Sequence, residues 1–222
     1  MRKIYTVGGD YGYANWMEGK NTHNFHEADL VLFTGGEDVD PITYNQESHP
    51  RTYSNIKRDK FESVFYKEAL KQNKHIVGIC RGAQFLCAMN GGILIQDQQN
   101  HNHTHSIYTY DNKTIMVNSL HHQAQYPWLL PKDKYEILGW SIGESKYHLG
   151  WENNHDKEMV NKIVEDNKEV ENVYYPETKC LTIQSHPEML FGYMNYREFD
   201  NTLTNTIEYF RVLLNKFMEN NL

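Results

Sequence analysis

Short apolar runs alternate with longer segments of helical periodicity along this 222-residue chain. Runs rich in β-branched and aromatic residues predict buried strands, at residues 3–7, 30–33, 76–79, 169–175 and 180–184. Apolar residues that recur every three or four positions predict helices, at residues 59–72, 82–89 and 201–217. Strands that alternate with helices form βαβ units, so the pattern predicts an α/β fold with a mostly parallel sheet.

The pattern also makes local predictions. Asp59 is expected to cap the helix at 59–72, whose inward face would carry apolar residues, namely Phe61, Val64, Phe65, Ala69 and Leu70. Residues 8–29 lack a full-length helical pattern, so we expect a short first crossover and a sheet that lacks a strand at one edge. Residues 104–110 and 114–117 predict a hairpin around Asp111.

Composition narrows the class of protein. The chain is 39% hydrophobic, and its length fits one α/β domain. Its 29 acidic and 22 basic residues are scattered and give a net charge of −7, so we expect neither nucleic acid nor a membrane as partner. Three cysteines make no disulfide framework, and we find no apolar run near 18 residues and no signal-peptide pattern, so we expect a cytoplasmic protein.

Cys80 stands where the strand at 76–79 meets the helix at 82–89, with Gly78 and Gly82 two residues to either side. A sharp strand-to-helix turn leaves little room for side chains at those two positions, which is the pattern of a nucleophile elbow. The turn also places the sulfur at a helix N-terminus, which favours the thiolate. The alternative is a buried structural cysteine beside a capping glycine.

His186 and Glu188 follow the strand at 180–184, 106 and 108 residues after Cys80. Alternate residues of an extended segment point to one side, and Pro187 ends the strand, so the Glu188 carboxylate is expected to brace the His186 imidazole. A nucleophile, a base and an orienting acid are what covalent acyl transfer requires.

Several motifs in one order resemble a known superfamily, the class I glutamine amidotransferases. They are G-I-C-R-G-A-Q at 78–84, S-H-P-E at 185–188, F-T-G-G-E-D-V-D-P at 33–41 and N-S-L-H-H-Q at 118–123. The set is similar to the γ-glutamyl hydrolase branch, the peptidase C26 type that includes γ-glutamyl-γ-aminobutyrate hydrolases. The resemblance implies a flavodoxin-like three-layer sandwich, here a single domain over 1–222 with a divergent insert at about 142–167.

The resemblance also implies roles for individual residues. Cys80 would be the nucleophile, His186 the proton-transfer group and Glu188 its orienting acid. The backbone N–H groups of Gly36 and Arg81 would form the oxyanion hole. The implied substrate-binding residues are Gln84, Ser119, Leu120 and His121.

His101, His103 and His105 alternate with other polar residues and would face one way on a strand. Three interpretations remain open: a metal site, a solvated loop near the rim of the active site, or a substrate contact. No acidic cluster or cysteine lies nearby in the sequence, so we expect no metal there, and the cysteine chemistry that the resemblance implies needs no cofactor.

Two enzymatic functions follow from the resemblance. One is hydrolysis of a γ-glutamyl amide through a glutamyl thioester, which releases glutamate and an amine. The other is a glutaminase subunit that supplies ammonia to a separate synthetase partner. A catalytically silent binding subunit is a third alternative. The insert at 142–167 and the loop at 101–105 are candidates to contact the leaving group, and the sequence names neither that group nor the oligomeric state.

Overall fold

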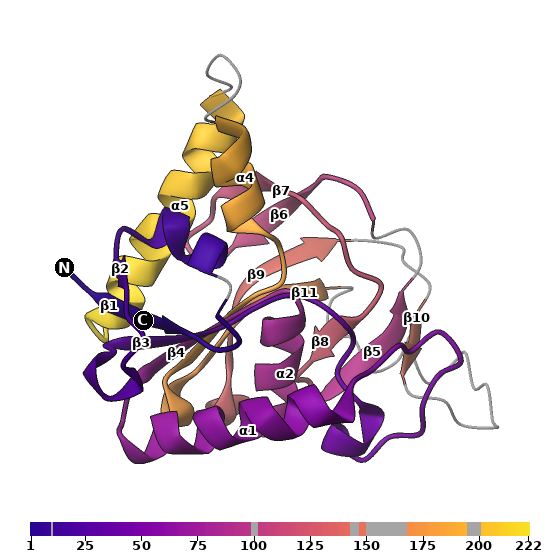
Figure 1. The fold of residues 1–222 in the computed structure, drawn as a ribbon. Helices are drawn as coiled ribbons and strands as arrows, with labels where there is room; N and C mark the ends of the chain where they lie inside the picture. Colours follow the sequence, from indigo (N-terminus) through magenta and orange to yellow (C-terminus); the bar gives the residue numbers. More distant parts are fainter. Residues whose placement is uncertain (10, 99–101, 143–146, 150–167, 195–200) are drawn as a thin grey trace.

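The computed structural model describes residues 1–9, 11–98, 102–142, 147–149, 168–194 and 201–222 (Figure 1). Five strands of the main sheet run parallel to one another, in the order β2 Lys20–Asn21, β1 Lys3–Thr6, β3 Leu30–Phe33, β4 His75–Ile79 and β12 Cys180–Ile183. The sheet continues through antiparallel pairings, in the order β11 Lys168–Tyr175, β9 Glu136–Ile142, β6 His105–Thr109 and β7 Thr114–Val117. A smaller sheet contains β10 Tyr147–Leu149, β5 Ile93–Gln98 and β8 Ala124–Tyr126.

Helices cover both faces of the main sheet, which makes three layers (Figure 1). One face carries α1 Ile56–Lys71 and α2 Arg81–Met89, with a core that includes Phe33, Tyr66 and Phe85. The opposite face carries the 3₁₀ segment η1 Tyr11–Met17, α4 Pro187–Met194 and α5 Asn201–Met218. The structure therefore confirms the predicted α/β class and shows that the sheet has an antiparallel half.

The strand register brings the motifs to one edge of the sheet. Phe33 of β3 pairs with Gly78 of β4, and Ile79 pairs with Ile183 of β12. The motifs directly follow the carboxyl ends of these three parallel strands, and ligands bind at that edge in open α/β sheets. The loop after β3, the turn at Cys80 and the segment after β12 therefore lie next to one another.

The first crossover is short, as predicted, because η1 takes the place of a full helix. The prediction that the sheet lacks a strand at this edge was wrong, because a short strand, β2, pairs in parallel with β1 over two residues. The hairpin β6–β7 and helix α5 are confirmed. Most of the divergent insert at about 142–167 lies outside the described residues.

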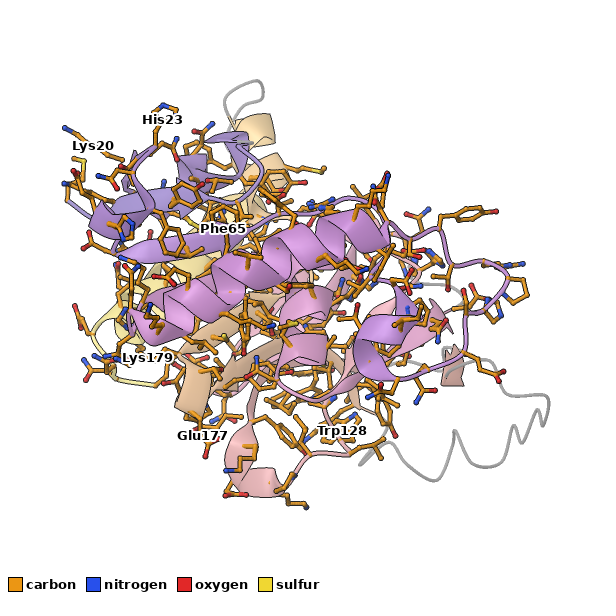
Figure 2. The ribbon with its side chains drawn as sticks, turned by 60° about the horizontal axis from the view of Figure 1, so that its bottom comes forward. Lys20, His23, Phe65, Trp128, Glu177 and Lys179 are labelled. Atoms are coloured by element: carbon orange, nitrogen blue, oxygen red, sulfur yellow. The ribbon has the colours of Figure 1, made fainter. Side chains whose placement is uncertain are left out.

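Helix α1 differs from the prediction. It begins at Ile56 with Asn55 as its N-cap, and Asp59 is not a cap but is buried in the first turn. Two predicted core residues are exposed, Phe61 at 51% and Val64 at 64%. Phe65 is partly buried and stacks on Tyr5 at 5.6 Å between ring centroids, close to β1 (Figure 2).

The buried face of α1 holds two carboxylates beside its apolar members: Asp59, Glu62, Tyr66 and Ala69. Spacings of three, four and three residues place these side chains on one stripe of a helix. A carboxylate is stable in that position only when it is paired, and Arg81 at the start of α2 supplies the partner.

Candidate active site

Cys80 joins β4 to α2 in a strained conformation, with φ of 52° and ψ of −111°. A Cβ at Gly78 would lie 2.4 Å from the carbonyl oxygen of Gly82, and a Cβ at Gly82 would lie 2.3 Å from that of Phe33. The Cys80 N–H donates to the Ile183 carbonyl at 2.8 Å, which ties the turn to β12. The chain thus holds the Cys80 side chain at the N-terminus of α2, in the geometry predicted for an elbow.

His186 follows β12, and its Nδ1 lies 2.6 Å from Oε1 of Glu188. Glu188 reaches it from the first turn of α4, since the helix begins at Pro187, and not from the extended segment that the sequence predicted. Burial lowers the pKa of His186, but hydrogen bonds with Cys80 and Glu188 outweigh it and raise that pKa to about 10. The imidazole is therefore charged at neutral pH and lies between a thiol and a carboxylate.

Two residues that were not predicted as site residues hold His186 in place. Asn118 accepts from the His186 N–H at 2.8 Å through Oδ1 and donates to the His186 carbonyl at 3.1 Å through Nδ2. Gly35 lies so close that a Cβ there would be 3.1 Å from Cε1 of the imidazole. Asn118 is the first residue of the N-S-L-H-H-Q motif, so its membership in that motif could have identified it as a site residue.

A cavity of about 270 Å³ opens beside Cys80. It contains six of the predicted site residues, Gly36, Cys80, Arg81, Gln84, Leu120 and His121. Its other lining residues were not predicted as site residues: Glu37, Asp38, Tyr53, His122 and Gln123. Ser119, which was predicted with Leu120, is buried and is not among the lining residues.

The two backbone groups expected to form an oxyanion hole border this cavity. Gly36 has φ of +134°, a conformation that favours glycine. Arg81 is the first residue of α2, so its N–H has no partner within the helix. The guanidinium of Arg81 forms ion pairs with Asp59 and Glu62 of α1. Burial raises the pKa of Asp59, and its bonds with the Asp40 N–H and with Arg81 act in the opposite direction.

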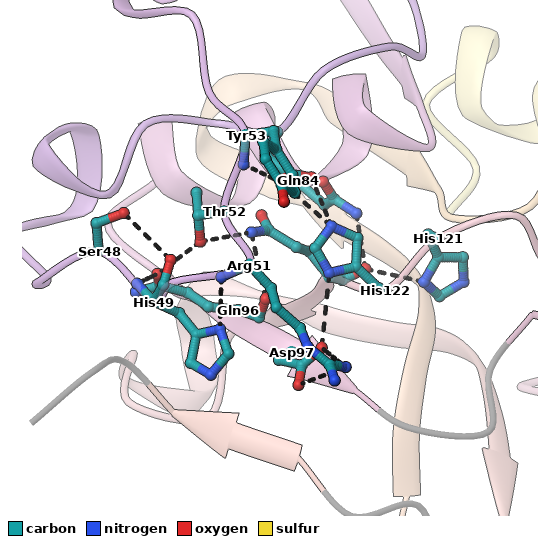
Figure 3. A network of polar contacts seen from close by, with 12 residues as sticks. Ser48, His49, Arg51, Thr52, Tyr53, Gln84, Gln96, Asp97, His121 and His122 are labelled. Carbon is teal, nitrogen blue, oxygen red and sulfur yellow. Dashed lines mark hydrogen bonds and ion pairs between the residues drawn. The ribbon is translucent and has the colours of Figure 1, made fainter.

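The segment at 118–123, which follows β7, is hydrogen-bonded to α2 through the carbonyl group of Gln123. The Gln123 oxygen accepts from Nε2 of Gln84 at 2.7 Å, and Nδ1 of His121 lies 2.8 Å from the same oxygen (Figure 3). Gln84, predicted as a substrate contact, therefore uses its amide nitrogen to position the cavity wall.

A row of polar and charged side chains includes His122, Asp97 and Arg51 (Figure 3). His122 Nε2 is 3.1 Å from Asp38, and its Nδ1 is 3.7 Å from Asp97, which is in turn 3.4 Å from Arg51. The hydrogen bond to Asp38 raises the pKa of His122, and burial opposes it. His122 thus lies between two carboxylates, which favour its protonated form.

The histidine loop at 101–105 is only partly described, since His101 lies outside the described residues. His105 Nε2 lies 2.9 Å from the buried Glu171, and the rings of His103 and His105 are 6.0 Å apart. Neither residue is among those that line the cavity. Within the described ranges, no three His, Cys, Asp or Glu side chains are grouped as a metal site.

Comparison with known proteins bears on both sequence and fold. Residues 17–112 match the Peptidase C26 family. The protein NtpR of Enterococcus hirae is 35% identical over 122 residues, which are 44% of this chain and 51% of that protein. A putative glutamine amidotransferase-like protein, a YvdE homolog of Lactococcus lactis subsp. cremoris, is 37% identical over 119 residues, 43% of this chain and 63% of that protein. The chain thus spans about half to three fifths of these relatives.

Solved structures extend the likeness of fold. A glutamine amidotransferase of Thermotoga maritima matches with a TM-score of 0.52 at 14% identity, over 98% of this chain and 94% of the other. A putative GMP synthase component of Thermoplasma acidophilum matches with the same score and identity, over 85% of each chain. In the part of the chain that the structure describes, no helix is long and apolar enough to cross a bilayer. These findings confirm the resemblance to class I glutamine amidotransferases of the peptidase C26 type.

Proposed function

We propose that the protein hydrolyses the amide bond of a γ-glutamyl compound through a thioester on Cys80. The observation that carries this proposal is the hydrogen bonding of His186 with both Cys80 and Glu188, together with the place of Cys80 on the wall of the cavity. A charged imidazole beside a thiol at a helix N-terminus favours the thiolate, which is the reactive form of cysteine. Glu188 holds that imidazole in one orientation.

Each step of the proposed reaction is assigned to a group of this site. The thiolate attacks the γ-carbonyl carbon, a C–S bond forms, and the N–H groups of Gly36 and Arg81 stabilise the charge on oxygen. The oxyanion collapses, the C–N bond breaks, and His186 gives its proton to the departing amine. His186 then takes a proton from water as that water attacks the thioester, which releases glutamate and restores the thiolate.

The cavity also bears on the leaving group. Glu37 and Asp38 line it, while His122 is already paired with two carboxylates and Arg81 with two more. A leaving amine that carries its own carboxylate would meet like charge here, so we propose that neutral or cationic amines are preferred.

A second candidate function is a glutaminase subunit that delivers ammonia to a separate synthetase. The names of the relatives, putative glutamine amidotransferases, favour it. Under this alternative the purified chain would be slow on every substrate until its partner is added.

A release assay on the purified chain tests both functions. It compares free glutamine with γ-glutamyl amides whose leaving amines are cationic, neutral or anionic. We expect robust cleavage of at least one conjugate without a partner and loss of turnover in Cys80→Ala. The matched control is Cys87→Ala, which removes another buried thiol of α2 away from the cavity and should retain activity.

Two results would contradict the proposal. Turnover that survives in Cys80→Ala would exclude Cys80 as the nucleophile. Inactivity of the wild type on the whole panel, relieved only by a synthetase, would favour the glutaminase subunit. A silent binding subunit would show no turnover and no labelling of Cys80 by a glutamine-like chloroketone.

A further inference from the structure

We propose that Arg58 and Glu62 of α1 are positioning residues that aim both backbone donors of the oxyanion hole at the reacting carbonyl. This inference rests on the proposed thioester chemistry and assigns a task to residues that do not line the cavity. The argument concerns the loop after β3, the start of α2 and the helix that connects them.

Arg58 sets the direction of the Gly36 N–H. Its Nη2 donates to the carbonyl oxygen of Gly35 at 2.9 Å and to that of Thr34 at 3.2 Å. The peptide between Gly35 and Gly36 is trans, so its C=O and N–H point in opposite directions. Because Arg58 holds the C=O, the N–H must point away from Arg58, and Gly36 borders the cavity there with Cys80.

In its present position, Arg58 occupies the space that a side chain at Gly36 would need. A Cβ on Gly36 would lie 2.2 Å from Nη1 of Arg58. The positive φ of Gly36 favours glycine, and a side chain there would also push the Arg58 guanidinium away from the loop carbonyls. The loop is held from behind by a planar group with several donors, which a single point charge would not replace.

Glu62 links this loop to the second donor. One carboxylate oxygen accepts from Nε of Arg58 at 2.8 Å, and the other pairs with the guanidinium of Arg81. The backbone N–H of Arg81 is the other expected oxyanion donor. One carboxylate thus fixes the relative position of the two N–H groups, and Asp59 supports Arg81 from the next turn.

The energetic argument favours an orienting role. A buried ion-pair network usually contributes no more stability than well-packed apolar residues would. Donors fixed before the reaction, in contrast, stabilise the transition state without a cost of reorganisation, and each is worth roughly 10²-fold to 10³-fold in rate. We therefore expect changes at Arg58 to act on oxyanion stabilisation more than on the thiolate.

Three measurements on Arg58→Ala separate these effects. Hydrolysis of a γ-glutamyl anilide requires both the thiolate and the oxyanion hole. Alkylation of Cys80 by iodoacetamide requires the thiolate alone, because displacement of iodide forms no oxyanion. Glutaric semialdehyde, a γ-glutamyl aldehyde without the α-amino group, requires the hole without turnover. The sulfur adds to its carbonyl carbon, the π pair moves to oxygen in the hole, and the thiol proton remains on His186.

The variants include a conservative change and a matched control. Arg58→Lys keeps the charge and one donor to the loop carbonyls. Arg211→Ala removes an arginine whose side chain has the same exposure of 24% and which also bonds a carbonyl, that of Trp16, and a carboxylate, that of Glu18. It lies outside the residues that line the cavity.

We expect Arg58→Ala to lower kcat/KM by about 10²-fold and to weaken formation of the hemithioacetal, followed by ¹³C NMR, by a similar factor. Its rate of alkylation should change by less than about threefold, Arg58→Lys should recover part of both losses, and Arg211→Ala should retain wild-type values. Should Arg58→Ala fail to fold, the same comparison made with Arg58→Lys decides the question.

Equal losses in alkylation and hydrolysis would overturn the inference, since Arg58 would then act through the thiolate or the fold. So would wild-type affinity for the aldehyde in Arg58→Ala, or the absence of a hemithioacetal in the wild type. A wild type that binds the aldehyde but hydrolyses nothing would contradict the proposed function instead, and the aldehyde comparison would still decide the role of Arg58.

Discussion

Helices α1 and α5 show the same helical periodicity in the sequence but pack in different ways. In α5 five apolar side chains at helical spacing are buried, and of its described apolar positions Val212 is exposed at 38%: the buried ones are Ile207, Phe210, Leu213, Leu214 and Phe217. In α1 two of the apolar positions, Phe61 and Val64, face solvent, and the carboxylates of Asp59 and Glu62 face inward. The two helices lie on opposite faces of the sheet (Figure 1).

The difference teaches what each helix does. Helix α5 closes the core, and its orientation follows from the area of apolar surface that it buries. Helix α1 lies beside the elbow, where a buried guanidinium at Arg81 needs carboxylates within reach. The rotation of α1 about its axis turns Asp59 and Glu62 toward this charge. As a result, Phe61 and Val64 stay exposed to solvent.

The largest effect on stability is expected from truncating a core side chain of α5. Phe210→Ala should lower the free energy of unfolding by roughly 3 to 5 kcal/mol, because Phe210 is fully buried and packs at 6.1 Å from Trp16. Urea denaturation measures this loss. The kcat per folded molecule should remain near that of the wild type, and a parallel loss of kcat would show that α5 also supports the site.

Glu62→Gln should have a smaller effect on stability, about 3 kcal/mol, because Asp59 remains as a partner of the buried Arg81. Unlike Phe210→Ala, it should also lower kcat/KM, which a hydrolysis assay measures. The adjacent Phe61→Gln is the matched control, since Phe61 is half exposed and its change should stay within about 0.5 kcal/mol. Wild-type stability and kcat/KM in Glu62→Gln would show that the buried carboxylate of α1 has no role that sets this helix apart from α5.

The smallest effect is expected in the pH dependence of kcat/KM. It concerns Glu188 in the first turn of α4, a helix that, like α1, turns a carboxylate toward the site. The pKa of His186 is raised to about 10, so the charged acid should persist through neutral pH, and kcat/KM should fall as pH rises through about 10. Glu188→Gln removes one group that raises this pKa and should move the falling limb to lower pH by roughly one unit or more.

The pH–rate profiles of the wild type and Glu188→Gln measure that shift. His105 lies outside the cavity lining and should leave the limb unchanged when it is replaced by Gln. A falling limb that stays in place in Glu188→Gln would show that the carboxylate does not set the pKa of His186.

Much of the fold could be predicted from the sequence, because strands and helices of a buried sheet are encoded by neighbours in the chain. The run 76–79 and the glycines around Cys80 sufficed for the elbow, since the clash of a Cβ there is local. His186 and Glu188 are two residues apart, so their contact needed only a turn between them.

The remaining site residues depend on distant partners. Asp38 meets His122 across 84 positions, Asn118 meets His186 across 68 and Arg81 meets Asp59 across 22. The periodicity of apolar residues does not reveal such contacts, and in α1 it wrongly placed Phe61 and Val64 in the core. The sequence by itself determined the strands, the strained turn at Cys80 and the adjacent histidine and carboxylate, because those depend on local sterics. Only the tertiary structure decided which charges are buried and which loops line the cavity, because pairing a buried charge depends on what the fold brings beside it.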